Sequence, residues 1–173
     1  MRINVMAAVV TAVLLVSLSP LPASADPSPV AVEQQRKVAA ELAAHPGGVQ
    51  IGPNQIAYPG GLIVTVTRPG TAAAAPQPDC PSGWFCFYEQ RQFGYPRGQL
   101  SDLGWQDLAT WRWQDRTESV HNNLPCGAVV YLNHPAGTSS HGGDMRLFEA
   151  SARQSIADLG ANRNIADHVY RYC

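Results

Sequence analysis

The sequence predicts an all-β sandwich over residues 79–173, preceded by a small unit of one helix and one β-hairpin. Three observations support this: short apolar or alternating runs recur between turn residues, all four cysteines lie in this half, and part of the pattern occurs twice. Strand-length runs at such spacing are typical of sandwiches and barrels. We predict a helical turn only at Trp105–Trp111. The strand-like runs are 84–88, 99–103, 118–124, 128–132, 145–149 and 168–172.

The internal repeat keeps the same order in both halves. Cys86-Phe87-Tyr88 aligns with Val129-Val130-Tyr131, and Glu118-Ser119-Val120 aligns with Asp167-His168-Val169. The second copy is longer, and the loop 133–143 accommodates its extra residues. We therefore expect two half-domains of similar plan, each of about four strands, paired into one sandwich.

The N-terminus has the order of a secretory signal peptide. Met1-Arg2 supplies a positive charge, an apolar run follows from Val5 to Leu18, and Ala23-Ser24-Ala25 provides a cleavage site. The apolar run is shorter than the roughly 20 residues that a membrane-spanning helix needs. We expect cleavage after Ala25, so that residues 1–25 are a signal peptide and the product is secreted to the extracellular space without a membrane anchor.

The charge of the chain does not favour a polyanionic partner. The whole chain has a formal net charge of −1, and removal of residues 1–25 takes away one arginine and no acidic residue, which leaves −2. Binding of nucleic acid or anionic lipid requires a concentrated basic face. We expect no nucleic-acid partner, and we expect a monomer.

Residues 26–68 form the N-terminal unit. Val30–Ala44 is predicted to be a helix, because Val32, Val38 and Leu42 lie on one side, and the Pro-Gly-Gly run at 46–48 ends it.

Two β-like runs follow, at 55–58 and 62–67, and Pro59-Gly60-Gly61 between them predicts a hairpin. Residues 69–78 are rich in proline and alanine and form a predicted linker. One helix and one hairpin bury little apolar surface. The unit therefore packs on the rest of the chain, binds a partner or is removed.

Four cysteines in an exported chain predict two disulfides. Cys80 and Cys86 are six positions apart with Pro and Gly between them, which lets the chain fold back and bring their Cβ atoms within bonding distance. Cys126 would then pair with Cys173, and closure of that loop contributes about 4 kcal/mol. Crossed pairings and a metal site are the alternatives, but neither pair has the spacing of zinc ligands.

The run Cys80-Pro81-Ser82-Gly83-Trp84-Phe85-Cys86-Phe87-Tyr88 resembles the Cys-Pro-x-Gly-x-x-Cys-x-Tyr opening of peptidase inhibitor family thirty-six, the Streptomyces-type metalloproteinase inhibitors. The resemblance implies the βγ-crystallin fold, with two Greek keys in a two-sheet sandwich. Tyr88–Phe93 also looks like the aromatic-x4-aromatic corner of a crystallin Greek key. Residues 45–56 resemble the N-terminal extension of secreted actinomycete members. The partner implied is a secreted protease, by resemblance a metalloproteinase.

The chain departs from the family pattern in three places. Tyr95 occupies the corner position where glycine is usual, and no aromatic residue follows Tyr131 at the corresponding place in the second half. The type inhibitor's second disulfide closes a short reactive loop, whereas Cys126 and Cys173 are far apart in this sequence. The inhibitory loop is therefore unassigned, with 90–98 and 133–143 as the candidates.

The crystallin resemblance also raises the question of calcium. Crystallin domains of microbial type bind it through an Asn/Asp-Asn/Asp-x-x-Ser/Thr-Ser loop, and residues 114–119 keep Asp115 and Ser119 of that pattern. The second copy, 163–168, keeps Asn164 but loses the closing serine. Because hard cations need several oxygen ligands, one calcium site at Asp115 and Ser119 and an ordinary turn both stay open.

No catalytic residue is assigned. Ser139-Ser140-His141 lies in a glycine-rich loop, and the chain has neither a G-x-S-x-G nor an H-E-x-x-H motif. His141-Gly142-Gly143-Asp144 has only weak metal-ligand spacing, for which a solvated loop is the simpler interpretation. The four tryptophans, all between 84 and 113, are expected in the core rather than on a binding surface.

The leading hypothesis is a secreted protease inhibitor that is not an enzyme and requires no cofactor. The alternative is a structural or calcium-binding crystallin-type module without a protease target. A secreted toxin-like or wall-associated factor has the same fold signals.

Overall fold

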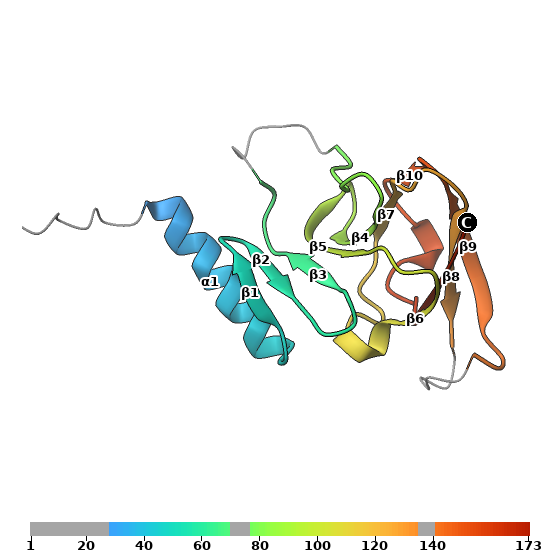
Figure 1. Cartoon of the computed structure of the whole chain (residues 1–173), viewed down its shortest axis with the longest axis horizontal. Coiled ribbons are helices and arrows are strands. Elements are labelled where there is room, and N and C mark those ends of the chain that lie inside the picture. The colour runs from blue at the N-terminus through green and yellow to red at the C-terminus, as the bar shows by residue number, and fades with distance from the viewer. Residues whose placement is uncertain (1–27, 70–76, 135–140) are drawn as a thin grey trace, which may run out of the picture.

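The computed structural model describes residues 28–69, 77–134 and 141–173, whose arrangement is shown in Figure 1. The expected signal peptide and most of the expected linker lie outside the described residues. The N-terminal elements are α1 (Pro29–Ala44), β1 (Val49–Gly52), β2 (Gln55–Ala57) and β3 (Ile63–Thr65). They are followed by β4 (Phe85–Gln90), β5 (Gly94–Leu100), β6 (Gly104–Asp107), the 3-10 turn η1 (Leu108–Trp111), β7 (Ser119–Asn122), β8 (Ala128–Asn133), β9 (Met145–Ser151), β10 (Ser155–Ile156), the 3-10 turn η2 (Gly160–Asn162) and β11 (His168–Tyr172).

The strands form two antiparallel sheets with the orders β1-β2-β3-β5-β4-β7-β10 and β6-β11-β8-β9. In the first half β4 pairs with β5 and β7, and in the second half β8 pairs with β9 and β11. The third strand of each half crosses to the other sheet, because β6 pairs with β11 and β10 pairs with β7. The all-β sandwich of two Greek keys, preceded by a small helix, is therefore confirmed.

Four strands differ from the sequence-based expectation. Trp105–Asp107, the first part of the expected helical turn, belongs instead to β6, which pairs along its length with β11. The turn begins only at Leu108, where the Asp107 carboxylate accepts a hydrogen bond from Ala109 N at 2.8 Å and caps it. β5 begins at Gly94 rather than at residue 99, and neither β1 nor β10 was expected.

Gly98 explains why β5 can lie so close to β4. A Cβ atom at this position would come within 2.2 Å of Cε2 of the Phe87 ring. Only glycine leaves room for that ring, which is fully buried.

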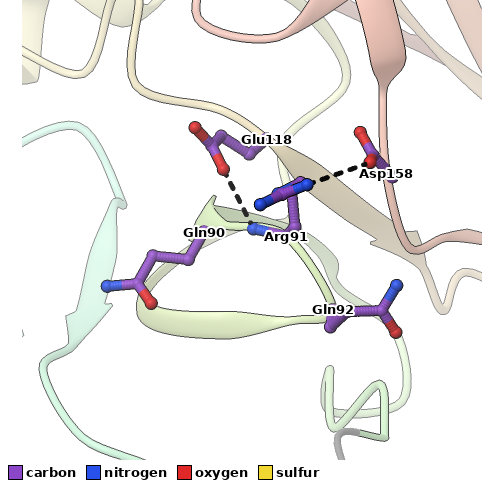
Figure 2. Close-up of a pocket in the computed structure, with 5 residues that line it drawn as sticks. All are labelled: Gln90, Arg91, Gln92, Glu118 and Asp158. Atoms are coloured by element: carbon purple, nitrogen blue, oxygen red, sulfur yellow. Dashed lines mark hydrogen bonds and ion pairs between the residues drawn. The ribbon is translucent and has the colours of Figure 1, made fainter.

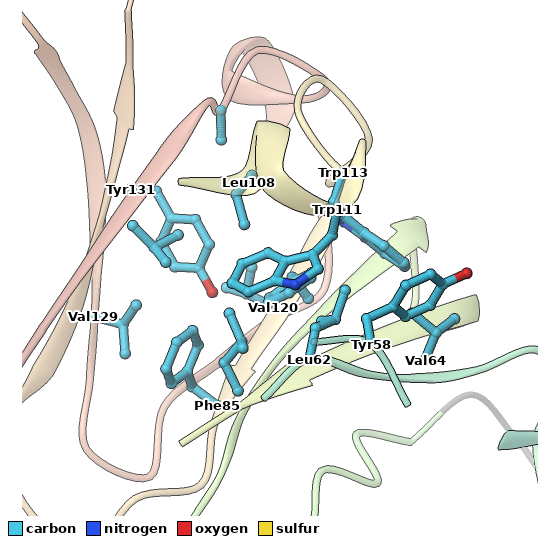
Figure 3. Packing of buried hydrophobic residues seen from close by; sticks show 14 of the residues in the cluster. Tyr58, Leu62, Val64, Phe85, Leu108, Trp111, Trp113, Val120, Val129 and Tyr131 are labelled. Atoms are coloured by element: carbon cyan, nitrogen blue, oxygen red, sulfur yellow. The ribbon is translucent and has the colours of Figure 1, made fainter. Parts of the chain in front are cut away.

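A single apolar core joins the two sheets and the N-terminal unit (Figure 3). Phe85, Phe87 and Trp113 are fully buried at its centre. The N-terminal unit adds buried side chains to the same cluster, namely Val38, Ile56, Tyr58, Leu62, Val64 and Val66.

Two further contacts join the N-terminal unit to the sandwich. β3 pairs with β5, and Trp111 Nε1 donates to the carbonyl oxygen of Pro59 at 2.6 Å. Of the three expected roles for this unit, the structure shows it packed on the rest of the chain. Trp111 and Trp113 are core residues as expected, whereas Trp105 is 42% exposed.

Both expected disulfides are present, Cys80–Cys86 and Cys126–Cys173. The second bridge spans 47 positions and joins the end of β11 to the start of β8. Separately, no helix among the described residues is long and apolar enough to cross a membrane.

The shared core predicts that residues 79–173 are less stable alone. Removal of residues 26–78 would uncover the β5 edge and the apolar surface beneath Leu62 and Val64. We expect the free energy of unfolding to fall by roughly 3 kcal/mol or more. Urea denaturation of 26–173 and 79–173 under the same oxidising conditions measures this difference, and equal midpoints would show that the unit is a detachable accessory.

Candidate functional site: the β4–β5 turn

The connection between β4 and β5 places three consecutive polar side chains in solvent. Gln90 ends β4, and Arg91 and Gln92 form the turn that follows; all three are exposed. Figure 2 shows them around an open hollow that Glu118 and Asp158 complete. This turn lies at the start of the expected loop 90–98, most of which is the ordered strand β5.

The backbone of the turn is held from below by side chains of the neighbouring segment. Ser119 Oγ accepts a hydrogen bond from Phe93 N at 3.1 Å and donates one to the carbonyl of Gln90 at 2.7 Å. Glu118 Oε2 accepts from Arg91 N at 3.1 Å, and Gln92 N donates to the carbonyl of Ala157 at 2.7 Å. The amides of Arg91, Gln92 and Phe93 therefore all have partners, and the turn is fixed.

This bracing offsets an unfavourable backbone conformation. Gln92 and Phe93 have φ values of 55° and 58°, in the left-handed region that side chains with a Cβ rarely occupy. Such positions cost energy and persist only where the surroundings impose them. Phe93 is buried, and its ring packs edge-on against Tyr88 with the centroids 5.5 Å apart.

The departure at Tyr95 now has a physical reason. The positive φ values of the corner fall on Gln92 and Phe93. Position 95 therefore does not require glycine, and Tyr95 lies in β5. Its hydroxyl donates to the Asp79 carboxylate, to which Tyr88 also donates, at 3.0 Å. Burial raises the pKa of both tyrosine hydroxyls, so they stay protonated donors at neutral pH.

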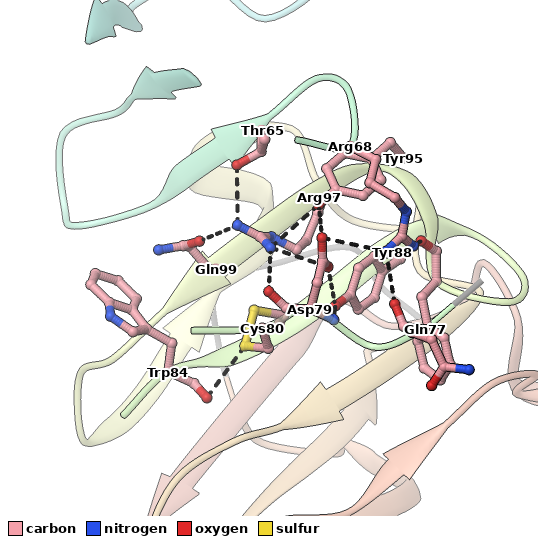
Figure 4. A network of polar contacts seen from close by, with 12 residues as sticks. Thr65, Arg68, Gln77, Asp79, Cys80, Trp84, Tyr88, Tyr95, Arg97 and Gln99 are labelled. Atoms are coloured by element: carbon pink, nitrogen blue, oxygen red, sulfur yellow. Dashed lines mark hydrogen bonds and ion pairs between the residues drawn. A yellow bond between two sulfur atoms is a disulfide. The ribbon is translucent and has the colours of Figure 1, made fainter. Parts of the chain in front are cut away.

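A buried arginine extends this network to the N-terminal unit (Figure 4). Arg97, 3% exposed, donates to the Asp79 carbonyl at 2.7 Å and to Gln99 Oε1 at 2.8 Å, and it reaches Thr65 Oγ1 at 3.3 Å. Arg68 donates to the carbonyl of Phe93 at 2.9 Å. The turn is thus supported by β3 and β5 as well as by β7.

The side chain of Arg91 is free to meet a partner. It is 59% exposed, and its contact is with Asp158 Oδ2 at 3.9 Å. Exposed ion pairs of this kind contribute roughly 0–1 kcal/mol. A partner carboxylate that excludes water can therefore replace Asp158 at little cost.

A second exposed, braced loop was missed in the sequence. The Cys80–Cys86 disulfide closes it, and Pro81, Ser82 and Gly83 are exposed at its tip. Asn123 fixes both sides, since its amide group donates to the Cys80 carbonyl at 2.7 Å and its carbonyl accepts from Gly83 N at 3.0 Å. The short Cys spacing was the signal that could have identified this loop.

The middle of the other expected loop, with the serine pair, lies outside what the structure describes. Residues 135–140, which include Ser139 and Ser140, belong to the candidate loop 133–143 and are not among the described residues. No catalytic arrangement is assigned from them.

The expected calcium loop has a structural role at one of its two named residues. Ser119 is fully buried, and its hydroxyl serves the β4–β5 turn. Asp115 and its counterpart Asn164 have left-handed φ values of 57° and 55°, and each backbone amide donates across to the other loop. Burial, with the nearby Asp167 carboxylate, raises the pKa of Asp115. Calcium binding at Asp115 and Ser119 stays a prediction.

A polar cluster attaches α1 to the sandwich. Arg116 contacts Glu89 Oε2 at 3.0 Å, Glu41 Oε1 at 3.4 Å and His45 Nε2 at 2.8 Å, and its guanidinium lies over the Trp113 ring. Burial, followed by the positive charge of Arg116, lowers the pKa of His45. Burial raises the pKa of Glu41, and Arg116 opposes this shift.

Ser119→Ala tests the brace of the β4–β5 turn. Loss of the hydroxyl leaves Phe93 N and the Gln90 carbonyl without that partner, and we expect the free energy of unfolding to fall by about 2 kcal/mol. Thermal and urea unfolding measure the effect. Ser155→Ala, at an exposed serine of β10, is the control and should change stability by less than about 0.5 kcal/mol. Equal effects of the two substitutions would contradict the brace.

The lowered pKa of His45 predicts a pH dependence of stability. The folded state favours the neutral ring, so stability is present above the unfolded pKa of about 6.5 and is lost as pH falls below it. In His45→Gln, the loss between pH 7.5 and 5.0 should be smaller than in the unsubstituted chain. Urea titrations at the two pH values measure this, and parallel losses in both proteins would rule out His45 as a source.

Comparison with known proteins agrees with the sequence resemblance. Residues 73–142 match the family model described as peptidase inhibitor family I36. No curated protein matches the chain. A solved structure from a study of the evolution of the eye lens beta-gamma-crystallin domain fold is similar at 13% identity with a TM-score of 0.42, covering 56% of this chain and 91% of its own. The resemblance to peptidase inhibitor family I36 predicted from the Cys80–Tyr88 motif is thus confirmed over residues 73–142.

Proposed function

We propose that this chain is a secreted inhibitor of an extracellular protease, by resemblance a metalloproteinase, and that the β4–β5 turn enters the protease cleft. One observation carries the choice of surface: Gln90, Arg91 and Gln92 are exposed side chains on a backbone fixed by hydrogen bonds to Glu118, Ser119 and Ala157. The family match supports inhibition rather than catalysis. The two disulfides are consistent with export.

A fixed turn suits inhibition because binding then orders little of the chain. Association costs translational and rotational freedom, and each loop or side chain that must be immobilised adds to this cost. The hydrogen bonds already hold the turn in one conformation. Little of the free energy gained from contacts with the protease is therefore spent on ordering the turn. A braced backbone also resists the adjustment that peptide cleavage requires.

Within the turn, Arg91 is the side chain that we expect to contribute most. Arginine is enriched among the residues that dominate binding energies, because its planar group donates several hydrogen bonds at once. A protease carboxylate or carbonyl in the cleft supplies the matching acceptor. Gln92, beside it, offers an amide that both donates and accepts.

Arg91→Ala should weaken inhibition without unfolding the chain. We expect the inhibition constant against a susceptible protease to rise at least about tenfold, equivalent to about 1.4 kcal/mol. The measurement is an inhibition titration of residues 26–173 against a panel of secreted metalloproteinases and serine proteases.

Arg146→Ala is the matched control, since Arg146 is 62% exposed and also pairs with one carboxylate, that of Glu149. It should change the inhibition constant less than twofold. Inhibition that is equally strong in Arg91→Ala and Arg146→Ala would place the contact elsewhere, with the Cys80–Cys86 loop the next surface to vary. Absence of inhibition across the panel at excess of the unsubstituted chain would overturn the function itself.

A further inference from the structure

Three side chains that could bind a metal ion converge at one end of the smaller sheet. His134 follows β8, Asp144 precedes β9, and His168 is the first residue of β11. Their ligand atoms all lie within 4.8 Å of one another. His134 and His168 are separated by 34 positions in the sequence, and the pairing of β8 with β11 brings them together.

The contacts within the cluster centre on the Asp144 carboxylate. Nδ1 of His134 lies 2.5 Å from one carboxylate oxygen, and Nδ1 of His168 lies 2.8 Å from the other. The side chains of His134, Asp144 and His168 are only 6%, 3% and 1% exposed. A buried carboxylate requires cationic or hydrogen-bonding partners, and two imidazoles occupy that role here.

A third imidazole lies at the rim of the cluster. His141 Nδ1 is 3.9 Å from Asp144 Oδ2, and the His141 side chain is 36% exposed. Trp105 of β6 holds this ring, because the two rings stack with centroids 3.9 Å apart and an interplanar angle of 14°. His141 can therefore complete a four-ligand site from the solvent side.

The surroundings of His168 favour metal binding at Nδ1, the ring nitrogen that faces Asp144. Its Nε2 faces Asp107 Oδ1 at 3.8 Å, and Ala109 N fixes that carboxylate by donating to it at 2.8 Å. At 3.8 Å the contact is too long for a hydrogen bond, but the negative charge of Asp107 favours a proton on Nε2, which leaves the Nδ1 lone pair for a metal ion. Histidine ligands in proteins characteristically have a carboxylate or carbonyl behind them in this way.

We propose that His134, Asp144 and His168, with His141 at the rim, form a binding site for a divalent transition-metal ion of the zinc type. Imidazole nitrogens with one carboxylate are the donors that Zn²⁺ prefers, whereas Ca²⁺ and Mg²⁺ prefer oxygen ligands alone. The site is distinct from the expected calcium loop at Asp115 and Ser119. At metal–ligand distances of about 2.0–2.1 Å, tetrahedral ligand atoms lie about 3.3 Å apart, so the two contacts to Asp144, now 2.5 and 2.8 Å, would widen by about 0.5–0.8 Å around the ion.

The experiment uses the untagged, oxidised chain 26–173 after removal of metal with a chelator. Titration with Zn²⁺ in a calorimeter should show one site per chain with a dissociation constant of roughly 1 µM or tighter. Co²⁺ should give the strong visible absorption of a tetrahedral site, which reports geometry independently of activity. Ca²⁺ should neither compete with Zn²⁺ nor displace Co²⁺.

Substitutions distinguish a built site from scattered histidines. Asp144→Asn removes a central ligand and should abolish Zn²⁺ binding. His141→Gln removes the ligand at the rim and should weaken it. Asp107→Asn leaves every ligand in place and should weaken Zn²⁺ binding about 10- to 100-fold. His45→Gln is the control, because His45 also faces a carboxylate, that of Glu41 at 3.8 Å, but lies outside the cluster; it should not change binding.

Two results would overturn the proposal. One is the absence of saturable Zn²⁺ binding by the unsubstituted chain at 100-fold above the expected dissociation constant, which would leave the cluster as a hydrogen-bonded network only. The other is equal affinity in the unsubstituted chain, Asp107→Asn and Asp144→Asn. Asp107 is 23% exposed, and asparagine keeps a side-chain oxygen that can cap the 3-10 turn. Asp107→Asn is therefore expected to fold, and it keeps the test decisive if Asp144→Asn does not fold.

Discussion

The strand that the rest of the structure depends on is β4, which is buried on both faces. Phe85, Cys86, Phe87 and Tyr88 are all fully buried, although an antiparallel sheet commonly has one face in water. Phe85 and Phe87 point into the core between the sheets, while Cys86 and Tyr88 belong to a smaller cluster with Cys80 and Phe93. Hydrogen bonding to β5 on one side and β7 on the other leaves β4 no free edge.

The outer face of β4 is covered by the segments that support the candidate site. The Cys80–Cys86 disulfide lies on it, and Tyr88 holds both Asp79 and the ring of Phe93. The β4–β5 turn is therefore the exposed end of a buried strand rather than an independent loop. Its position relative to the core is set by packing, and its conformation is set by Ser119 and Glu118.

Local signals in the sequence were sufficient for much of the fold. The Cys80–Tyr88 motif indicated the family, the first disulfide and the start of β4, and the apolar spacing of residues 30–44 predicted α1. The repeat between Cys86-Phe87-Tyr88 and Val129-Val130-Tyr131 corresponds to β4 and β8, which occupy equivalent places in the two Greek keys. The Cys80–Tyr88 motif and the apolar spacing of the helix are each read within one short segment, and the repeat only compares two such segments.

The features that were not predicted depend on contacts between distant segments. Trp105, Leu108 and Trp111 recur at helical spacing, yet pairing with β11 makes the first part of that run a strand. The brace of the turn joins residues 90–93 to Ser119 and Ala157, and no local pattern reveals it. The histidine cluster likewise exists only because β8 and β11 are neighbours. Spacing along the chain could suggest only the pair His141 and Asp144.

The exchange of β6 and β10 between the sheets bears on how readily a protease could degrade the chain. The third strand of each Greek key, β6 or β10, pairs with a strand of the other Greek key. Neither half can therefore separate without breaking the sheet of the other half. A protease cuts a folded protein mainly when a segment opens, and the rate of cutting follows the population of the open form. We therefore expect the two halves to open together rather than one at a time. The topology thus leaves few partly opened forms that a protease could cut.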